Sequence, residues 1–188
     1  MSQPASRAIT PPWTVDGWDL AADLAKIEQQ WAEVREILND ATRFELRHPP
    51  TSAWGLGEQA GHSVITTLAI AKGVEGNLAE PERDRDQERA AMAEALLRAG
   101  DFPRGRGTAP KALDPAGRSR EDLAALVPPA VQAWSGLAAR ADALASCPAR
   151  FRHVFFGYLT SAEWVRFCAI HTAHHLALVR DIEANLRA

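Results

Sequence analysis

The sequence lacks the features that mark several large classes of protein. Its 188 residues contain two cysteines, Cys147 and Cys168, in neither a CxxC nor a zinc-finger spacing. They imply no disulfide framework and favour a chain kept reduced. No apolar run approaches the roughly 18 residues of a membrane-spanning helix, and residues 1–13 lack the apolar segment of a signal peptide. We therefore expect a cytoplasmic protein with no membrane partner.

An excess of basic residues is also missing. The chain has 21 Lys and Arg residues and 24 Asp and Glu residues, for a formal net charge of −3. A protein that coats nucleic acid needs a clear basic excess to neutralise phosphates, so we expect no nucleic-acid partner. Hydrophobic residues make up 46% of the chain, which suffices for one packed core. We predict an arm at residues 1–14 and a single domain at 15–188.

Sustained alternation of apolar and polar residues, which identifies strands, is missing as well. Apolar residues recur instead at steps of three and four, the spacing of amphipathic helices. This spacing predicts helical segments at about 16–48, 55–78, 90–98, 129–146 and 160–188. We therefore predict an all-α protein: a four-helix bundle with a short extra helix and a long loop between its second and third main helices.

Local signals indicate where two of these helices begin. Thr51 or Ser52 is expected to cap the second main helix, because either hydroxyl can accept from the first free N–H groups. Thr160 or Ser161, closely followed by Glu163, is expected to cap the last one in the same way.

The remaining segments are interpreted as breaks and loops. Pro128-Pro129 must kink or split the third main helix. The stretch PARFRHVFFGYL at 148–159 is predicted to be an aromatic loop, and 100–118 a long loop that carries several bases. We interpret the bases as a solvated part of that loop, with an anion clamp over a pocket as the alternative. They are Arg104, Arg106, Lys111, Arg118 and Arg120.

Three of the six histidines fall within five positions of one apolar stretch, FCAIHTAHHL at 167–176. The three-four spacing of apolar residues in the last helix continues through His171 and then through His174 or His175, so these positions face the core. The solvent face is marked by charged residues, namely Arg166, Arg180 and Asp181.

His171 and His175 are one helical turn apart, so their rings lie on one side of the helix, as in sites where two imidazoles share a metal ion. His174 lies about 100° round from His175 and is expected beside the site or toward a partner. His62 of the second helix is a candidate third ligand. Three neutral imidazoles with an open position describe a catalytic site for zinc, nickel or iron. A metal-free set of hydrogen-bonded core histidines is the alternative.

Two segments, WGLGEQAGHS at 54–63 and FGYLTSAEWVRFCAIHTAHHL at 156–176, resemble the DinB/YfiT-like superfamily of metal-dependent enzymes. The resemblance is strongest to a branch with an LGQ-type helix start and an FGxLxxxEW loop before an HxxxH helix. It implies a four-helix bundle, usually dimeric, in which His62, His171 and His175 bind the metal. The chain departs from the branch at Val154, where proline is usual, and at Glu58, whose carboxylate could reach the site.

The same resemblance implies chemistry on a small-molecule substrate. Some relatives are put forward as hydrolases, and others are transferases or isomerases of low-molecular-weight thiols. We therefore expect a divalent transition metal, a low-molecular-weight thiol as a further candidate cofactor, and a homodimer. Thiol transfer is the leading hypothesis and hydrolysis the next. A non-catalytic metal-binding or stress-related dimeric bundle is the alternative, so enzymatic activity is left open.

Other residues near these motifs carry weaker signals. Glu58, Glu163 and Asp181 are the acids nearest the expected site in sequence, and none is assigned as a general base. Cys168 is interpreted as a small buried residue rather than a ligand. Trp54 is expected in core packing, with the wall of a pocket as the alternative.

Overall fold

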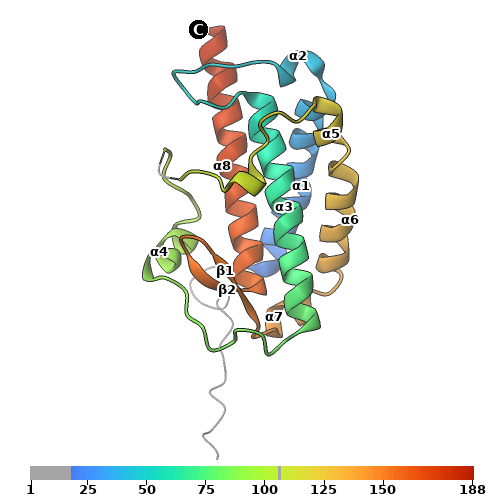
Figure 1. Cartoon of the computed structure of the whole chain (residues 1–188), viewed down its shortest axis with the longest axis vertical. Helices are drawn as coiled ribbons and strands as arrows, with labels where there is room; N and C mark the ends of the chain where they lie inside the picture. The colour runs from blue at the N-terminus through green and yellow to red at the C-terminus, as the bar shows by residue number, and fades with distance from the viewer. Residues whose placement is uncertain (1–17, 106) are drawn as a thin grey trace, which may run out of the picture.

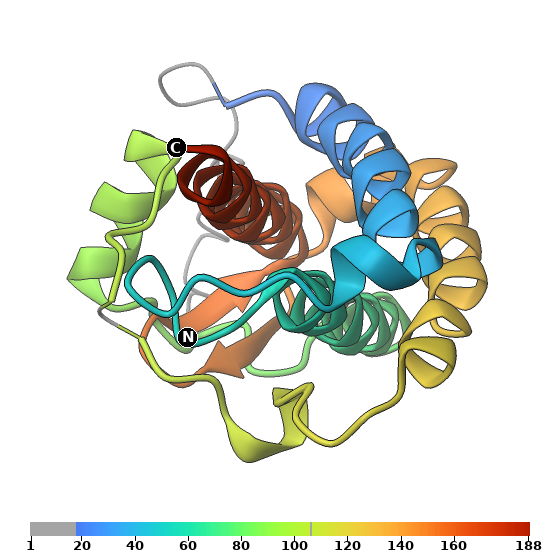
Figure 2. The ribbon, with the colours of Figure 1, turned by 90° about the horizontal axis from the view of Figure 1, so that it is seen from above.

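The computed structural model describes residues 18–105 and 107–188, so the predicted arm at 1–14 lies outside the described residues. The predicted all-α bundle is confirmed, and Figure 2 shows its helices end-on. Helix α8 packs between α1 and α3, and α6 packs against the same two helices from the other side. The four main helices are α1 (Leu20–Asn39), α3 (Leu56–Ala79), α6 (Val127–Ala138) and α8 (Ser161–Arg187).

Helices α1 and α8 run in one direction and α3 and α6 in the other (Figure 1). Asp23, near the start of α1, pairs with Arg166 near the start of α8. Asn77, near the end of α3, donates to Ser161 at the start of α8. Because α3 and α6 are parallel, the chain must travel back along the bundle between them, and this requires a long crossover. The crossover is the segment 80–119.

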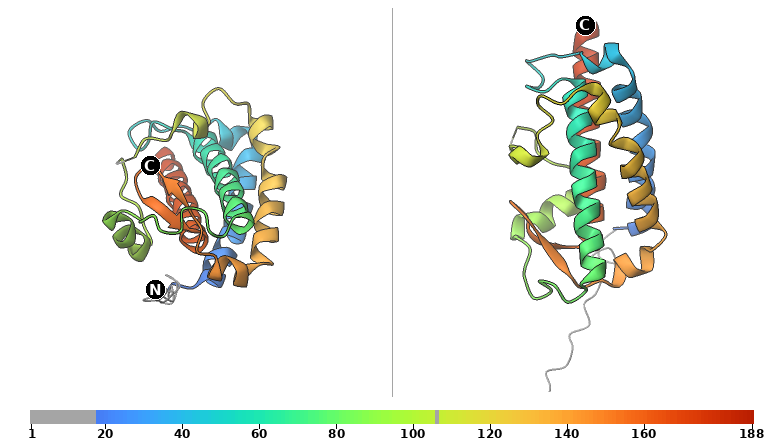
Figure 3. Two further views of the ribbon diagram at one scale, coloured as in Figure 1. Left: turned by 60° about the horizontal axis from the view of Figure 1, so that its bottom comes forward. Right: turned by 45° about the vertical axis from the view of Figure 1, so that its right-hand side comes forward.

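The described part of this crossover contains α4 (Ala91–Ala99) and a 3₁₀ turn (Lys111–Leu113). Helix α4 packs on α8, on the side away from α6, and the 3₁₀ turn lies against α3 (Figure 3). The helix predicted at 90–98 is α4, and each of its bounds differs from the prediction by one residue. In the described part of the chain, no helix combines the length and the apolar content that crossing a bilayer requires.

The third main helix is interrupted where the sequence predicts. The hydroxyl of Ser119 caps α5 (Arg120–Ala124), and α6 then begins anew at Val127. Pro128 and Pro129 consequently occupy the first turn of α6, where an N–H group has no partner inside the helix and its absence costs little. A further break separates α6 from α7 (Ala141–Ser146).

The aromatic segment before α8 is a hairpin, so its prediction as a loop at 148–159 is wrong. Strand β1 (Arg150–His153) pairs antiparallel with β2 (Gly157–Thr160). Each strand has only four residues, the shortest run over which alternation identifies a strand, and neither RFRH nor GYLT alternates strictly. The rings of Phe151 and Trp164 stack with centroids 4.2 Å apart, which fixes the hairpin against the start of α8.

Glutamate side chains fix the starts of both helices that carry the histidines. Thr160 caps α8 as predicted: it and Glu163 bond each other's backbone N–H group.

Helix α3 begins differently from the prediction. The N–H group of Gly55 donates to Oε2 of Glu58 at 2.9 Å, so neither Thr51 nor Ser52 is its cap. The carboxylate of Glu58 therefore caps the N-terminus of α3.

Candidate metal centre

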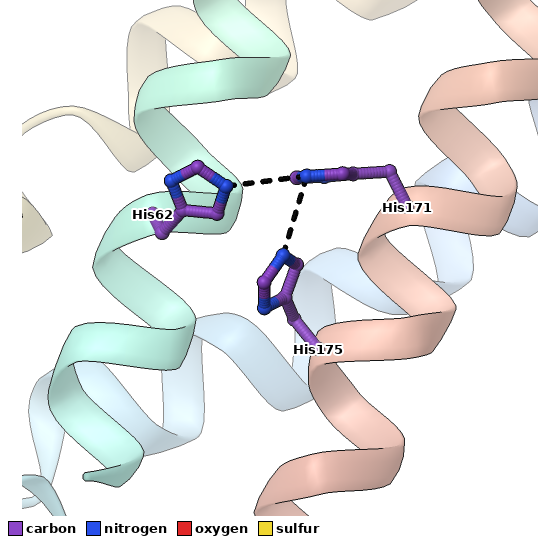
Figure 4. Close-up of side chains that lie close together, drawn as sticks. All are labelled: His62, His171 and His175. Carbon is purple, nitrogen blue, oxygen red and sulfur yellow. Dashed lines mark hydrogen bonds between the residues drawn. The ribbon is translucent and has the colours of Figure 1, made fainter. Parts of the chain in front are cut away.

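Helices α3 and α8 bring together three of the histidines that the sequence singles out (Figure 4). Nε2 of His171 lies 3.2 Å from Nε2 of His62 and 3.2 Å from Nε2 of His175. One ligand atom of each residue lies within 4.8 Å of the others. We call His62, His171 and His175 the three-histidine cluster. Among the described residues, no other group of three or more His, Cys, Asp or Glu side chains is arranged to hold a metal ion.

Two of the three rings are held through their outer nitrogen. Nδ1 of His62 lies 2.9 Å from the carbonyl oxygen of Leu113, and Nδ1 of His175 lies 2.5 Å from Oε1 of Gln59. Because a carbonyl oxygen only accepts, each Nδ1 carries the proton and donates. Nε2 of each ring must then present a lone pair to the middle of the cluster. Metal-binding histidines have this arrangement, since they commonly donate their other N–H group to a carbonyl or carboxylate oxygen.

The orientation of Gln59 is fixed in turn. Its side chain is buried, and its Nε2 donates to Oγ of Ser52 at 2.9 Å. The same Oγ accepts from the backbone N–H of Trp54 at 3.1 Å. The Gln59 amide is thus bonded at both ends, through Nε2 to Ser52 and through Oε1 to His175. The segment before α3 thereby contacts the residue that holds a ring on α8.

His171 is held in another way. Its Nδ1 is buried, and no group in the described ranges hydrogen-bonds to it. The ring stacks on Phe167, one turn earlier in α8, with centroids 5.3 Å apart and an interplanar angle of 22°. Because His62 and His175 carry their protons on Nδ1, only His171 could carry a proton on Nε2. Without a metal, that one proton would face the lone pairs of the other two Nε2 atoms.

Burial keeps these rings neutral. It lowers the pKa of His62, although the hydrogen bond to Leu113 and the charge of Asp114 oppose the shift. Burial lowers the pKa of His171 and of His175 well below the ordinary value, and the neighbouring histidines act in the same direction. At neutral pH each ring is therefore an uncharged imidazole, the form that binds a metal ion.

The spacing of the three-histidine cluster fits a transition metal. Imidazole nitrogens bind zinc at about 2.0–2.1 Å, so two of them at tetrahedral angles lie about 3.3 Å apart. The two Nε2 separations that involve His171 are 3.2 Å each, and all three ligand atoms lie within 4.8 Å of one another. Three neutral nitrogen donors suit zinc, nickel or ferrous iron and leave a further position free. The residues present thus fit the metal that the resemblance implies, and its binding stays a prediction.

Aromatic rings flank the cluster. The ring centroid of Trp54 lies 4.9 Å from that of His62 and 6.2 Å from that of His175. Phe102, which follows α4, packs on Phe167 with centroids 5.2 Å apart. Trp54 therefore lies beside two rings of the cluster, and its interpretation as the wall of a pocket stays a prediction.

The other histidines and the cysteine do not join the cluster. His174 is half-buried, and its ring lies edge-on to His175 at 5.3 Å and 6.4 Å from Phe102. His153 lies in the hairpin. Cys168 is buried and its Sγ faces Thr67 at 3.6 Å, which is the structural role that the sequence favours.

The acids considered from the sequence are engaged elsewhere. Glu58 pairs with Arg47 at 2.5 Å besides capping α3. Glu163, which is fully buried, pairs with Arg89 besides capping α8. Asp181 pairs with Arg104 of the long connection.

The bases of the connection have separate surroundings. Arg104 forms the pair with Asp181, and Arg120 donates to the carbonyl oxygen of Leu38 at 3.2 Å. Lys111 and Arg118 are exposed. Arg106 lies outside the described residues. For Lys111 and Arg118 this agrees with the interpretation as a solvated loop.

Three groups at the site were not singled out from the sequence. Gln59 precedes His62 by three residues, and Thr66 follows it by four, so helical spacing alone places both on its face. The Thr66 hydroxyl lies 3.4 Å from Nε2 of His62. The carbonyl of Leu113 has no sequence signal, because any residue at the end of the 3₁₀ turn would supply it.

A comparison with protein-family models agrees with this site. The family model described as the DinB superfamily matches residues 26–179, which contain all three members of the three-histidine cluster. No curated protein and no solved structure matches the chain. The family match covers more than half of the 188 residues. The chain therefore belongs to the DinB superfamily.

Proposed function

We propose that the protein is a metal-dependent enzyme for a small-molecule substrate, with a divalent transition metal held by Nε2 of His62, His171 and His175. The observation that carries the proposal is the convergence of three neutral rings, two of them fixed through Nδ1. Membership of the DinB superfamily supports it. When bound, the metal would supply a Lewis acid that lowers the pKa of a thiol or of water in its open position.

Thiol transfer is favoured over hydrolysis because no carboxylate belongs to the group that could hold the metal, within the described part of the chain. Glu58, Glu163 and Asp181 are each paired with an arginine. A thiol releases its proton when it binds a metal and then needs no general base. Activation of water at histidine sites commonly uses a glutamate for that purpose. A low-molecular-weight thiol is therefore the proposed co-substrate.

The chain's own residues would orient the site and keep it dry. Gln59 and Leu113 hold two rings in the tautomer that directs Nε2 inward. Trp54 and Phe167 cover the rings with apolar surface. Excluding water strengthens the interactions of charged groups, because the local dielectric constant falls.

The first test is the metal content of the protein purified without a histidine tag or chelator, measured by mass spectrometry. We expect about one zinc, nickel or iron atom per chain, and its loss from His62→Ala and His175→Ala. His174→Ala is the matched control, because His174 adjoins His175 on α8 and is not in the three-histidine cluster. It should keep the metal. Circular dichroism checks that each variant folds.

A wild type without metal, even after incubation with zinc or nickel, would overturn the proposal and leave a packed set of core imidazoles. A metal closed to exchange would favour the other class of function, a non-catalytic metal-binding bundle. Cobalt-loaded protein separates these outcomes, since azide or a small thiol should change its visible spectrum only if a coordination position is open. Thiols and electrophiles are then screened for turnover.

A further inference from the structure

Helix α3 carries three buried hydroxyl groups within five positions, and one of them is used differently from the others. Oγ of Ser63 donates to the carbonyl oxygen of Gln59 at 2.9 Å, and Oγ1 of Thr67 donates to that of Ser63 at 2.6 Å. A bond to the carbonyl four residues earlier satisfies a buried hydroxyl within its own helix. Thr66, placed between them, makes no such bond within the described residues.

The Thr66 hydroxyl faces the three-histidine cluster instead. Its Oγ1 lies 3.4 Å from Nε2 of His62, the only polar atom it contacts in the described ranges. Because Nδ1 of His62 donates to Leu113, Nε2 offers a lone pair and the hydroxyl must be the donor. A good hydrogen bond from a hydroxyl spans about 2.5–3.0 Å, so this contact uses the donor poorly. Thr66 is only 5% exposed, so bulk water does not compensate for the poor contact.

A metal on Nε2 of His62 would remove even this acceptor, because the metal takes up the lone pair. A buried donor without an acceptor is costly, so the hydroxyl would gain from an acceptor on the side that it already faces, close to the same nitrogen. A ligand in the open position of such a metal would be an acceptor of this kind, because the Thr66 hydroxyl lies beside one of the Nε2 atoms that would hold the metal.

We propose that Thr66 donates a hydrogen bond to the ligand in the open position and thereby makes that position selective for anions, including the thiolate form of a thiol. The inference rests on the proposed function, because it requires a metal on the three-histidine cluster. It assigns Thr66 a direct contact with the reacting group. A bond from a buried hydroxyl strengthens most when its acceptor is charged, so anions benefit more than neutral ligands.

Azide titration of the cobalt-loaded protein, followed by visible absorption, tests the inference. Thr66→Val removes the hydroxyl and nearly keeps the shape, whereas Thr66→Ser keeps the hydroxyl. Thr67→Val is the matched control, because the Thr67 hydroxyl is satisfied within α3. We expect Thr66→Val to load cobalt like the wild type and to bind azide roughly 10- to 100-fold more weakly, as for loss of a hydrogen bond to a charged group. Thr66→Ser and Thr67→Val should bind azide like the wild type.

Equal azide affinity in Thr66→Val and the wild type would overturn the inference. Loss of cobalt from Thr66→Val would overturn it too, because the hydroxyl would then hold His62 rather than the incoming ligand. If Thr66→Val does not fold, Thr66→Ala also lacks the hydroxyl and is judged by the same criteria. The proposed function fails separately, if the wild type takes up no cobalt or if azide leaves its spectrum unchanged.

Discussion

Helix α8 carries two buried polar clusters on different faces, and only one is completed by the protein. Toward α1, Arg166 donates to Asp23 at 2.8 Å and to the carbonyl oxygen of Leu97 at 3.1 Å. Its guanidinium also lies 5.9 Å from the ring centroid of Trp18. Toward α3, the three-histidine cluster points three nitrogen atoms at one another. The first cluster pairs opposite charges, and the second gathers atoms of the same kind.

This difference distinguishes a structural role from the metal-binding role proposed for the three-histidine cluster. Burial raises the pKa of Asp23, although the hydrogen bond and charge of Arg166 oppose the shift, so each partner depends on the other. The histidines carry no charge, and at most one proton lies among their three Nε2 atoms, so at least two Nε2 lone pairs compete for it. Their outer atoms are nevertheless fixed by Gln59 and Leu113. Polar atoms that are held in place and yet lack partners within the described chain are what the proposed metal site requires.

The largest effect is expected from breaking the completed cluster. Arg166→Met leaves the carboxylate of Asp23 buried without its partner, and losing one partner of a buried ion pair costs about 3–5 kcal/mol of unfolding free energy. Urea unfolding at neutral pH measures it. The double variant Asp23→Leu with Arg166→Met should recover most of the loss, because no unpaired charge remains. If Arg166→Met alone were as stable as the double variant, the buried carboxylate of Asp23 would not depend on Arg166 for its stability.

A smaller effect is expected from weakening the support of the incomplete cluster. Gln59→Leu removes the acceptor for Nδ1 of His175, and loss of such a partner typically weakens metal binding 10- to 100-fold, about 1.4–2.7 kcal/mol. Zinc affinity is measured in competition with a chromophoric chelator. Gln30→Leu is the matched control, because Gln30 is also buried and donates to Ala169 of α8, away from the histidines. Equal zinc affinity in all three proteins would contradict the role of Gln59.

The parts of this comparison that the sequence predicts depend on spacing along a single segment. Residues 171 and 175 share a face of any α-helix, and the cap that Thr160 and Glu163 form needs four consecutive residues. The prediction that His62 of α3 lies beside His171 and His175 of α8 also depended on the family resemblance, because the periodicity within one helix does not show which helix packs against it.

The parts that the sequence does not predict depend on contacts between segments. Arg166 is expected on the solvent face from the pattern of α8, but α1 and α4 cover it with Asp23 and Leu97. Leu113 reaches His62 because the parallel arrangement of α3 and α6 sends the crossover past α3. These contacts follow from the order of the helices in the bundle, which helical periodicity does not encode.

His153, in contrast to the cluster, has an Nδ1 atom that the chain's own backbone hydrogen-bonds. Its Nδ1 accepts from the backbone N–H groups of Phe155 at 3.1 Å and Phe156 at 3.2 Å, and burial lowers its pKa to about 4. In the unfolded chain the pKa is about 6.5. As the pH falls from 6.5 toward 4, His153 binds a proton in the unfolded state but stays neutral in the folded state, so the unfolding free energy decreases. We expect His153 to contribute a loss of up to roughly 3 kcal/mol as the pH falls through this window, and little change above it.

Urea unfolding at several pH values, with a chelator present, measures this contribution. His153→Asn retains an acceptor for the two backbone N–H groups and does not titrate. The unfolding free energy of the variant should therefore fall less steeply with decreasing pH than that of the wild type. Above about pH 6.5 the two curves of unfolding free energy against pH should have the same slope. Parallel curves throughout would mean that the folded protein admits a proton on His153 as easily as the unfolded chain does.

The smallest effect is expected where α1 and α8 are joined by an exposed ion pair. Nη2 of Arg180 lies 2.5 Å from Oε2 of Glu33, but 62% of the Arg180 side chain is exposed. Water screens such a pair, so a double-mutant cycle of Arg180→Ala and Glu33→Ala should give a coupling energy below about 1 kcal/mol. Added salt should reduce it further. The same cycle on Arg166 and Asp23 joins the same two helices and should give a larger coupling that salt hardly changes. If the exposed pair coupled as strongly as the buried one, burial would not explain why one polar cluster of α8 is structural, and the contrast with the three-histidine cluster would need another cause.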